Sequence, residues 1–478
     1  MAVSEGPLVV GVDSSTQSTK VLVVDAANGR TVAHGQAPHT VSADHESDPE
    51  QWWDALRQAL GQCGPAVRQA AAVSVAGQQH GLVTLDGQGR PVRPALLWND
   101  VRCAPQRDRL VEALGGPAAW AERTGSVPAP SFTAPKWRWL SETEPGAAAA
   151  TARVRLPHDF LTERLTGQGT TDRGDASGTG WWTPDDSGAG GYDAEVLGHI
   201  GLDPALLPRV LGAGEAAGTV RALPDLPLPA GALVASGTGD NMAAALGLGL
   251  RPGQPVLSLG TSGTVYAVSP RRPADPSGTV AGFADARGGW LPLACTLNCT
   301  LAVDRVAALL GRDREAVEAG GEAVLLPFLD GERTPHLPHA SGLVYGLRHA
   351  TSGGQVLQAA YDGAVFALLR ALDRVLEGAD APDAPVLLIG GGAQGTAWRE
   401  TVLRLSGRPV RVPRARELVA LGAAAQAAGL LLGEDPAHVA RRWDTAQGPA
   451  YPAVARDDAA LDRIAAVLDD ADTLLRRR

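Results

Sequence analysis

Two runs of β-branched apolar residues lie close together near the start of the chain, in VVGVDSSTQSTKVLVV at residues 9–24. Apolar runs of this length predict two neighbouring β-strands. The polar stretch between them, from Asp13 to Lys20, contains a carboxylate, hydroxyls, an amide and an ammonium group but no glycine. Short hairpin turns usually contain Gly or Asn. This stretch is either a polar hairpin tip or a loop that holds phosphate and metal.

Strands and helices are predicted to alternate through the following residues. Residues 28–35 predict a turn and a third strand. Apolar side chains at helical spacing predict a helix over residues 48–63, with Asp48 as the N-cap and Pro49 in the first turn. Residues 71–100 predict a strand, a polar loop, a hairpin and another strand. A mixture of hairpins and crossover connections is typical of an α/β fold.

The proline-rich segment 223–231 interrupts this pattern near mid-chain, and a similar pattern then begins again. Residues 255–269, PVLSLGTSGTVYAVS, repeat the sequence of strand, short polar loop and strand, and residues 386–405 run from a strand through glycines into a helical pattern. We therefore predict two related α/β domains that flank a central cleft, residues 1–232 and residues 233–478.

A nucleotide in such a cleft would be bound by the hairpin loops. Neither hairpin matches the helix-capped phosphate loop, and GGGAQG in the later strand-to-helix segment is not a convincing dinucleotide fingerprint. The two-domain organisation is similar to that of actin, the Hsp70 chaperones and sugar kinases, whose domains have the ribonuclease H-like fold.

Composition and charge narrow the class of protein. The chain has 478 residues, 44% hydrophobic and 20% charged, which is typical of a globular protein with two domains. The net charge of −10 argues against nucleic acid and anionic membranes as partners. No basic leader precedes an apolar core, and no apolar run reaches about 18 residues, so we expect a cytoplasmic protein.

Cysteines and lysines add two smaller points. The four cysteines are too few and too scattered for a disulfide framework, and no second Cys or His pair completes a metal site, so we expect buried thiols. Only two lysines occur, Lys20 and Lys136. That scarcity makes the lysine in the first polar stretch a candidate for function.

The first polar stretch has the chemistry of a phosphate and metal site. Asp13 stands at a strand end, where a carboxylate can hold Mg²⁺ through oxygen ligands. Ser15, Thr16 and Thr19 could donate hydrogen bonds to phosphate oxygens, and Lys20 could add positive charge. The alternative is an ordinary acidic residue at a strand-to-turn junction.

A second acidic residue follows a loop of small residues in SGTGDNMAAALGLGL at residues 236–250. Asp240 and Asn241 stand there between glycines and an apolar helix. Asp240 is either a plain N-cap, favoured by the helix dipole, or a carboxylate that a substrate approaches closely.

Further polar loops could bind a sugar. Gln79 and His80 lie between two glycines at a strand end, and Asp100 follows another strand in WNDVR. Residues 329–338 form a polar, proline-bounded loop. Each of these polar groups could hydrogen-bond sugar hydroxyls. The alternative is that each only hydrogen-bonds backbone groups of its own loop.

Taken together, these motifs resemble the FGGY family of carbohydrate kinases. The resemblance runs nearly end to end and rests on several short motifs in the family's order: DPEQWW, VAGQQHG, RPALLWND, SFTAPKWRWL, LPHDFLTERLTG, GDN, LSLGTSGTVYAVS, LPFLDGERTPH, GLVYGL and IGGGAQGTAWRETV. It implies ATP- and Mg²⁺-dependent phosphorylation of a ketopentose, with D-xylulose converted to D-xylulose 5-phosphate as the first expectation. Sugar and ATP are the implied partners, and family members are often homodimers.

The resemblance also implies roles for individual residues. Asp240 would be the catalytic base and, with Asp13, would face the metal. The residues implied to contact the sugar are Gln79, His80, Trp98, Asp100 and Asn241. Those implied to contact the nucleotide are Ser15, Thr16, Lys20, Gly260, Thr261, Ser262, Gly391, Gly392 and Thr396.

Two motifs differ from the common bacterial pattern of the family. DSSTQSTK replaces DLGTSGxK in the first loop, and Gln79 replaces a methionine before His80. Three alternatives follow from what the sequence leaves open: the same chemistry on another sugar or polyol, a non-catalytic sugar sensor, or a chaperone-type or filament ATPase of the actin superfamily.

Overall fold

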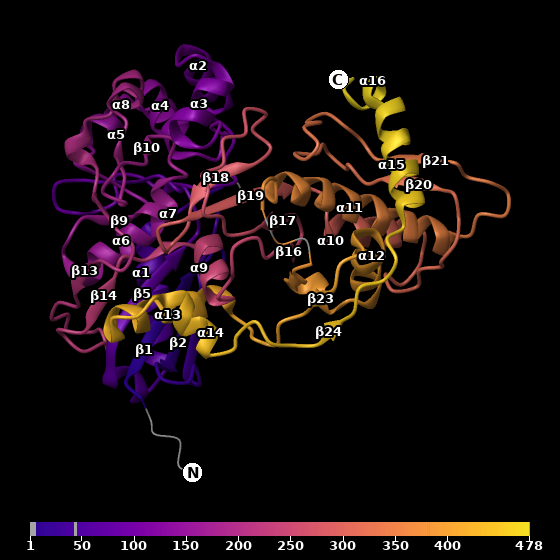
Figure 1. Ribbon diagram of the computed structural model, residues 1–478. Helices are drawn as coiled ribbons and strands as arrows, with labels where there is room; N and C mark the ends of the chain where they lie inside the picture. The colour runs from indigo at the N-terminus through magenta and orange to yellow at the C-terminus, as the bar shows by residue number, and fades with distance from the viewer. Residues whose placement is uncertain (1–5, 43–44, 380, 382, 478) are drawn as a thin grey trace, which may run out of the picture.

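The computed structural model describes residues 6–42, 45–379, 381 and 383–477, and it contains two large mixed sheets (Figure 1). The first sheet has the strand order β13-β14-β5-β1-β2-β3, and β15 also pairs with β5. Its strands are β1 (Leu8–Ser14), β2 (Ser18–Asp25), β3 (Thr31–Pro38), β5 (Ala70–Gly77), β13 (Ala216–Thr219), β14 (Leu233–Ala235) and β15 (Thr238–Gly239).

The second sheet repeats this topology. Its strand order is β18-β19-β17-β16-β22-β23-β24. In each sheet, the first strand of a hairpin (β1 or β16) is antiparallel to the second and parallel to a later strand (β5 or β22). The strands are β16 (Val256–Leu259), β17 (Gly263–Tyr266), β18 (Ala281–Ala284), β19 (Trp290–Thr296), β22 (Val386–Ile389), β23 (Val410–Arg411) and β24 (Ala450–Tyr451). The prediction of two related α/β domains of the ribonuclease H-like type is confirmed.

The two hairpins also match in their turns. β1 and β2 pair with Asp13 opposite Lys20 and Ser14 opposite Thr19, so only residues 15–17 form the turn. The polar stretch is therefore mostly strand, not loop. None of residues 14–18 has a positive φ, so the turn does not require glycine. Residues 260–262 form the equally short turn of the second hairpin.

The proline-rich segment 223–231 connects two strands of one sheet. It lies between β13 and β14, which pair in antiparallel fashion. β14 and β15 then pair in parallel with β5. The division expected after residue 232 therefore falls inside the first sheet, ahead of its last two strands.

Helices cover both faces of the first sheet. The predicted helix is α1 (Pro49–Gln62), and the side chain of Asp48 caps it by accepting a hydrogen bond from the backbone N–H of Glu50. α1 and α6 (Pro157–Thr166) pack with Val10 and Val12 of β1. The alternate residue Val9 packs with α13 (Leu418–Leu432) on the opposite face, as the two-residue period of a strand requires.

The helix α13 comes from the end of the chain but covers the first sheet. Figure 1 shows α13 and α14 (Pro436–Arg442), both yellow, beside the indigo strands β1 and β2. A Cβ atom on Gly11 would lie 2.0 Å from the carbonyl oxygen of Ala420, so the absence of a side chain at Gly11 permits this close approach. The helix thereby ties the second half of the sequence to the first sheet.

The second sheet has its own core, which is built mainly on the long helix α11 (Gly353–Val375) with α10 (Thr300–Leu309), α12 (Thr396–Ser406) and α15 (Asp458–Asp470). The other helices are α2 (Ala104–Ala113), α3 (Gly116–Thr124), α4 (Thr133–Thr143), α5 (Pro145–Ala150), α7 (Arg173–Ala176), α8 (Ala194–Ile200), α9 (Asp240–Gly247) and α16 (Asp472–Leu475), with 3₁₀ turns at Ala66–Gln69, Pro204–Leu206 and Gly391–Gln394.

Short strand pairs complete the secondary structure: β4 (Glu46–Ser47) with β7 (Ala95–Leu96), β6 (Val83–Leu85) with β8 (Arg153–Arg155), β9 (Thr170–Asp172) with β12 (Arg209–Leu211), β10 (Trp182–Thr183) with β11 (Gly191–Tyr192), and β20 (Val324–Leu326) with β21 (Leu343–Tyr345). Among the described residues, no single helix is both long and apolar enough to cross a membrane; α13 and α14 pass such a test only together, across a bend of 113°.

The contact between Gly11 and α13 predicts a stability difference between two glycine substitutions. Gly11→Ala places a Cβ against the backbone of α13, and overpacking of this kind costs about 1–3 kcal/mol. Gly61→Ala, in the exposed last turn of α1 with no atom near its Cβ, should instead be neutral or stabilise by about 0.5 kcal/mol. Chemical denaturation of both variants measures the difference, and equal stability would contradict this account of the helix–sheet contact.

Candidate active site

Three strands of the first sheet end together and bring the predicted residues to one edge. β5 lies between β1 and β15, with Gly77 opposite both Ser14 and Gly239. The backbone N–H of Gln78 donates to the carbonyl oxygen of Ser14 at 3.1 Å. Because parallel strands end at the same edge, the residues at the three strand ends, Asp13, Gln79 and Asp240, lie near one another.

A cavity of about 720 Å³ opens at this edge. Its walls come from both halves of the sequence, because residues of β16 and β22 line it together with residues of β1, β2 and α9. The predicted residues that line it are Asp13, Ser15, Lys20, Asp240 and Asn241. It therefore has the position expected for a nucleotide cleft.

The two carboxylates in the cavity have altered acidity. Burial raises the pKa of Asp13 to about 6, although a hydrogen bond from Ser15 and the charge of Lys20 oppose this. Burial, followed by the negative charges of Asp13 and Asp175, raises the pKa of Asp240 to about 7. A carboxylate with a pKa near neutrality is suited to accept a proton at physiological pH.

The carboxylate pair also fits a divalent cation. Magnesium is usually held by one or two carboxylates together with waters and substrate phosphates, rather than by a dedicated protein cage. Among the described residues, no group of three or more His, Cys, Asp or Glu side chains forms such a cage. Asp13 and Asp240 line one cavity, and their carboxylate oxygens are the kind of donor that a phosphate-bound Mg²⁺ takes.

Asn241 connects the two predicted sugar-site loops. Its side-chain Nδ2 donates to Oε1 of Gln79 at 2.5 Å and to Oδ1 of Asp240 at 3.0 Å. Nε2 of Gln79 is buried and has no hydrogen-bond partner among the described residues. This amide is thus a free donor beside the carboxylate of Asp240, as a sugar site requires.

His80 is held tightly on the other side of the same loop. It has a left-handed backbone, with φ of 60°. Its ring packs against Phe132 and Phe283, at centroid distances of 5.3 and 5.1 Å, and these two rings also contact each other. Nδ1 lies 3.1 Å from Oδ1 of Asp175. His80 therefore has one fixed orientation.

Of the two other residues predicted to contact sugar, one lies beside the first turn. Nε1 of Trp98 donates to Oγ1 of Thr16 at 3.1 Å, and the Trp98 side chain is 40% exposed. Asp100 is buried and forms an ion pair with Nε of Arg102 at 2.7 Å. The structure thus places Trp98 against the first hairpin and Asp100 against an arginine.

Lys20 forms an ion pair across the cavity. Its Nζ lies 2.6 Å from Oε2 of Glu417, which comes just before α13 and has a left-handed backbone with φ of 54°. Partly exposed pairs of this kind contribute about 0–1 kcal/mol. A phosphate group in the cavity could therefore compete with Glu417 for Lys20.

The predicted nucleotide residues of the second half are more dispersed. The carbonyl oxygen of Gly260 accepts hydrogen bonds from Thr300, while Thr261 and Ser262 are exposed at the turn. Gly392 is buried, and Gly391 is exposed. Thr396 lines a separate cavity of about 450 Å³, which shares Gln394 with the large cavity.

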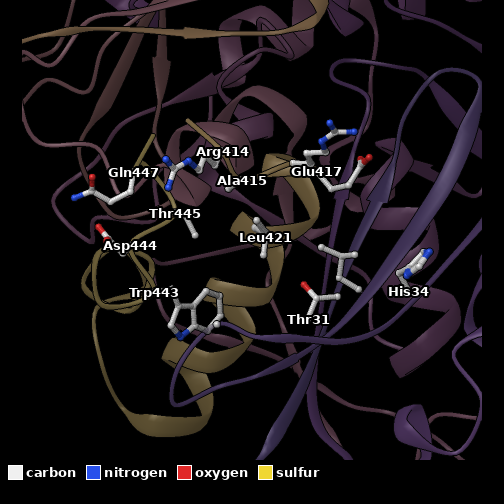
Figure 2. Close-up of a pocket in the computed structure, with 13 residues that line it drawn as sticks. Thr31, His34, Arg414, Ala415, Glu417, Leu421, Trp443, Asp444, Thr445 and Gln447 are labelled. Atoms are coloured by element: carbon white, nitrogen blue, oxygen red, sulfur yellow. The ribbon is translucent and has the colours of Figure 1, made fainter. Parts of the chain in front are cut away.

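Sequence reasoning missed the segment Arg414–Glu417, which lines the large cavity on one side. On its other side is a further cavity of about 570 Å³, where Figure 2 shows Leu421, Trp443 and Thr31. None of the predicted catalytic or binding residues lines this further cavity. In the sequence, residues 414–417 are marked only by three charged side chains directly before an apolar helix.

Two similar α/β domains, with hairpins and strand ends facing a common cavity and two carboxylates in its wall, define a phosphotransferase of the actin and sugar-kinase superfamily. The chain belongs to the FGGY family of carbohydrate kinases: the family's N-terminal domain matches residues 8–247 and its C-terminal domain matches residues 256–430. The prediction of a carbohydrate kinase is confirmed.

Several relatives are similar over nearly the whole chain. A xylulose kinase of Streptomyces rubiginosus is 74% identical over 479 residues, covering 100% of this chain and 99% of the relative. The crystal structure of xylulose kinase from Bifidobacterium adolescentis has a TM-score of 0.85 at 35% identity, covering 97% of this chain and 100% of the other. That of xylulose kinase from Rhodospirillum rubrum has a TM-score of 0.88 at 26% identity, covering 98% and 100%.

The raised pKa of Asp240 predicts that this carboxylate destabilises the nucleotide-free protein at high pH. Its pKa of about 7 in the folded protein exceeds the ordinary Asp value of 3.8, so its contribution to stability is lost as pH rises through this interval. Asp240→Asn should raise the free energy of unfolding by at least about 1 kcal/mol at pH 8, and by less at pH 5, where Asp240 is protonated.

Denaturation at both pH values measures this, and Asp186→Asn, at an exposed loop carboxylate, is the matched control. A stability gain of equal size at pH 5 and pH 8 would contradict the electrostatic explanation.

Proposed function

We propose that this protein transfers the γ-phosphoryl group of ATP to D-xylulose, giving D-xylulose 5-phosphate and ADP. The observation that carries the proposal is the carboxylate of Asp240, which faces the cavity between the two sheets and is linked through Asn241 to Gln79. The xylulose kinases named above, at 74% identity and below, support the choice of sugar.

In this proposal Asp240 accepts the proton of the attacking sugar hydroxyl. Its pKa of about 7 places it where a general base is effective at neutral pH. The buried donor of Gln79, together with His80, Asn241, Trp98 and Asp100, would orient the sugar. Phosphoryl transfer depends mostly on alignment and on neutralising oxygen charge, so one base and well-placed donors are sufficient.

The nucleotide would lie along the large cavity toward the second sheet. Ser15, Thr16 and Lys20 of the first hairpin and Gly260, Thr261 and Ser262 of the second would contact its phosphates. Gly391, Gly392 and Thr396 would lie near the adenosine. Asp13 and Asp240 would hold Mg²⁺, which when bound to ATP neutralises phosphate charge and orients the γ-phosphoryl group.

A closure of the two sheets around the cavity would complete the site. Thr396 lines a neighbouring cavity and not the large one, so its contact with a nucleotide in the large cavity would need these segments to come together. Closure would also exclude water and so limit ATP hydrolysis in the absence of sugar.

A coupled ADP-release assay with Mg²⁺-ATP tests the proposal across ketoses, aldoses and polyols. We expect D-xylulose to give the highest kcat/KM. Release of ADP that no sugar stimulates, from folded protein, would contradict the kinase proposal. Stimulation by many sugars to the same extent would contradict only the choice of D-xylulose.

The matched variant in this assay is Asp240→Asn. Loss of a general base typically lowers turnover by about 10²–10⁴-fold. Binding of ATP, measured by calorimetry, should persist because the two hairpins and Asp13, the other carboxylate proposed for the metal, are unchanged. Turnover near the wild-type rate would show that Asp240 is not the base.

A further inference from the structure

Four ionisable side chains form a buried cluster behind the predicted sugar loop. Nε2 of His158 lies 3.3 Å from Asp159, 3.2 Å from Asp172 and 3.7 Å from Asp175. Each of these side chains is at most 4% exposed. Charged groups are rarely buried together unless they are paired, because removing a charge from water is costly.

The cluster holds the segment that leads to Asp240. Oδ1 and Oδ2 of Asp172 accept hydrogen bonds from the first backbone N–H groups of α7. Oδ2 also accepts a hydrogen bond from Oγ1 of Thr238 at 2.7 Å. Thr238 lies in β15, directly before Asp240. Asp172 thus connects the cluster to the end of β15.

Asp175 connects the same cluster to His80. Its Oδ1 accepts a hydrogen bond from the backbone N–H of His80 at 3.3 Å and lies 3.1 Å from Nδ1 of the ring. Its Oδ2 faces His158. One carboxylate therefore bridges a histidine of the cluster and a histidine of the predicted sugar loop.

His158 places a positive charge beside this carboxylate. Burial alone would lower the pKa of His158, but the charges of Asp159, Asp172 and Asp175 raise it to about 9. The other titratable groups that face Asp175 are His80, Asp159 and, at longer range, Asp240. Oδ1 of Asp175 already accepts from the backbone N–H of His80, so this oxygen acts as an acceptor and the hydrogen bond with the ring places the proton on Nδ1.

Apart from Asp175, the described neighbours that contact the His80 ring are apolar or backbone groups. Phe132 and Phe283 contact the ring, and Gly178 is so close that an added Cβ would lie 1.7 Å from Cε1. Within the described part of the chain, the ring's hydrogen bond is made by Nδ1, to Asp175, and none is made by Nε2. A neutral ring protonated on Nδ1 presents the lone pair of Nε2.

We propose that Asp175 is a positioning residue, which fixes His80 in the Nδ1–H tautomer so that Nε2 accepts a hydrogen bond from a sugar hydroxyl. The inference rests on the proposed function, because the sugar is the ligand that His80 would meet. It resembles the role of carboxylates that orient histidine ligands from behind in metal sites. Asp175 itself does not touch the substrate.

The first test is the protonation state of the His80 ring, read from its ¹⁵N chemical shifts by two-dimensional NMR in the unliganded wild-type protein. The spectrum of His80→Asn assigns the signal, and the sample is kept at a pH where the ring is neutral. We expect a protonated Nδ1 and an unprotonated Nε2. The opposite tautomer would overturn the proposal, even if no kinase activity were found, and the test does not depend on any variant at Asp175 folding.

The second test compares Asp175→Asn with Asp159→Asn, a buried carboxyl of the same cluster that does not contact His80. Loss of a side chain that orients a binding group typically costs about 10–100-fold. We expect Asp175→Asn to raise KM for D-xylulose at least about tenfold. KM for ATP should stay unchanged, and the ¹⁵N shifts of His80 should move.

Asp159→Asn should change neither the sugar KM nor the His80 tautomer. Equal effects of both variants, or an unchanged sugar KM in folded Asp175→Asn, would show that the cluster is only structural.

Discussion

The parallel pairing of β5 with β1 on one side and with β14 and β15 on the other determines where every polar residue of the first half can act. All these strands end at one edge, so a carboxylate at the end of β1, an amide after β5 and a second carboxylate after β15 lie close together although they are far apart in the sequence. The second sheet repeats the hairpin and the parallel partner, which places its own turn and strand end opposite. The cavity between the sheets follows from this repeated topology.

Several carboxyl groups lie close together at this edge of the sheet. Their mutual repulsion costs free energy, which the packing of the surrounding fold must offset. Burial raises the pKa of both Asp13 and Asp240. The negative charges of Asp13 and Asp175 raise the pKa of Asp240 further. The packing of α13 on the first sheet and the buried pairing of His158 with its carboxylates hold the site together despite this repulsion. Unfavourable electrostatic interactions of this kind are common at functional sites, which are formed before the substrate binds.

Local patterns in the sequence predicted the hairpins, the helix capped by Asp48 and the two carboxylates, because each depends on neighbouring residues. They did not locate the end of the first sheet, since the prolines of residues 223–231 mark a connection between two strands and not a boundary. Asp175, Phe283 and Glu417 were also missed. Their places in the site result from contacts between segments far apart in the chain, which no local pattern encodes.

The most direct test of this account is a crystal structure with D-xylulose and an unreactive ATP analogue bound together. The account predicts the sugar beside Gln79 and His80, with the hydroxyl at C5 within hydrogen-bond distance of the Asp240 carboxylate and directed at the γ-phosphorus. The nucleotide should extend from the first hairpin to the end of β22. A sugar bound away from Asp240, or a nucleotide bound outside the cavity between the sheets, would contradict the account.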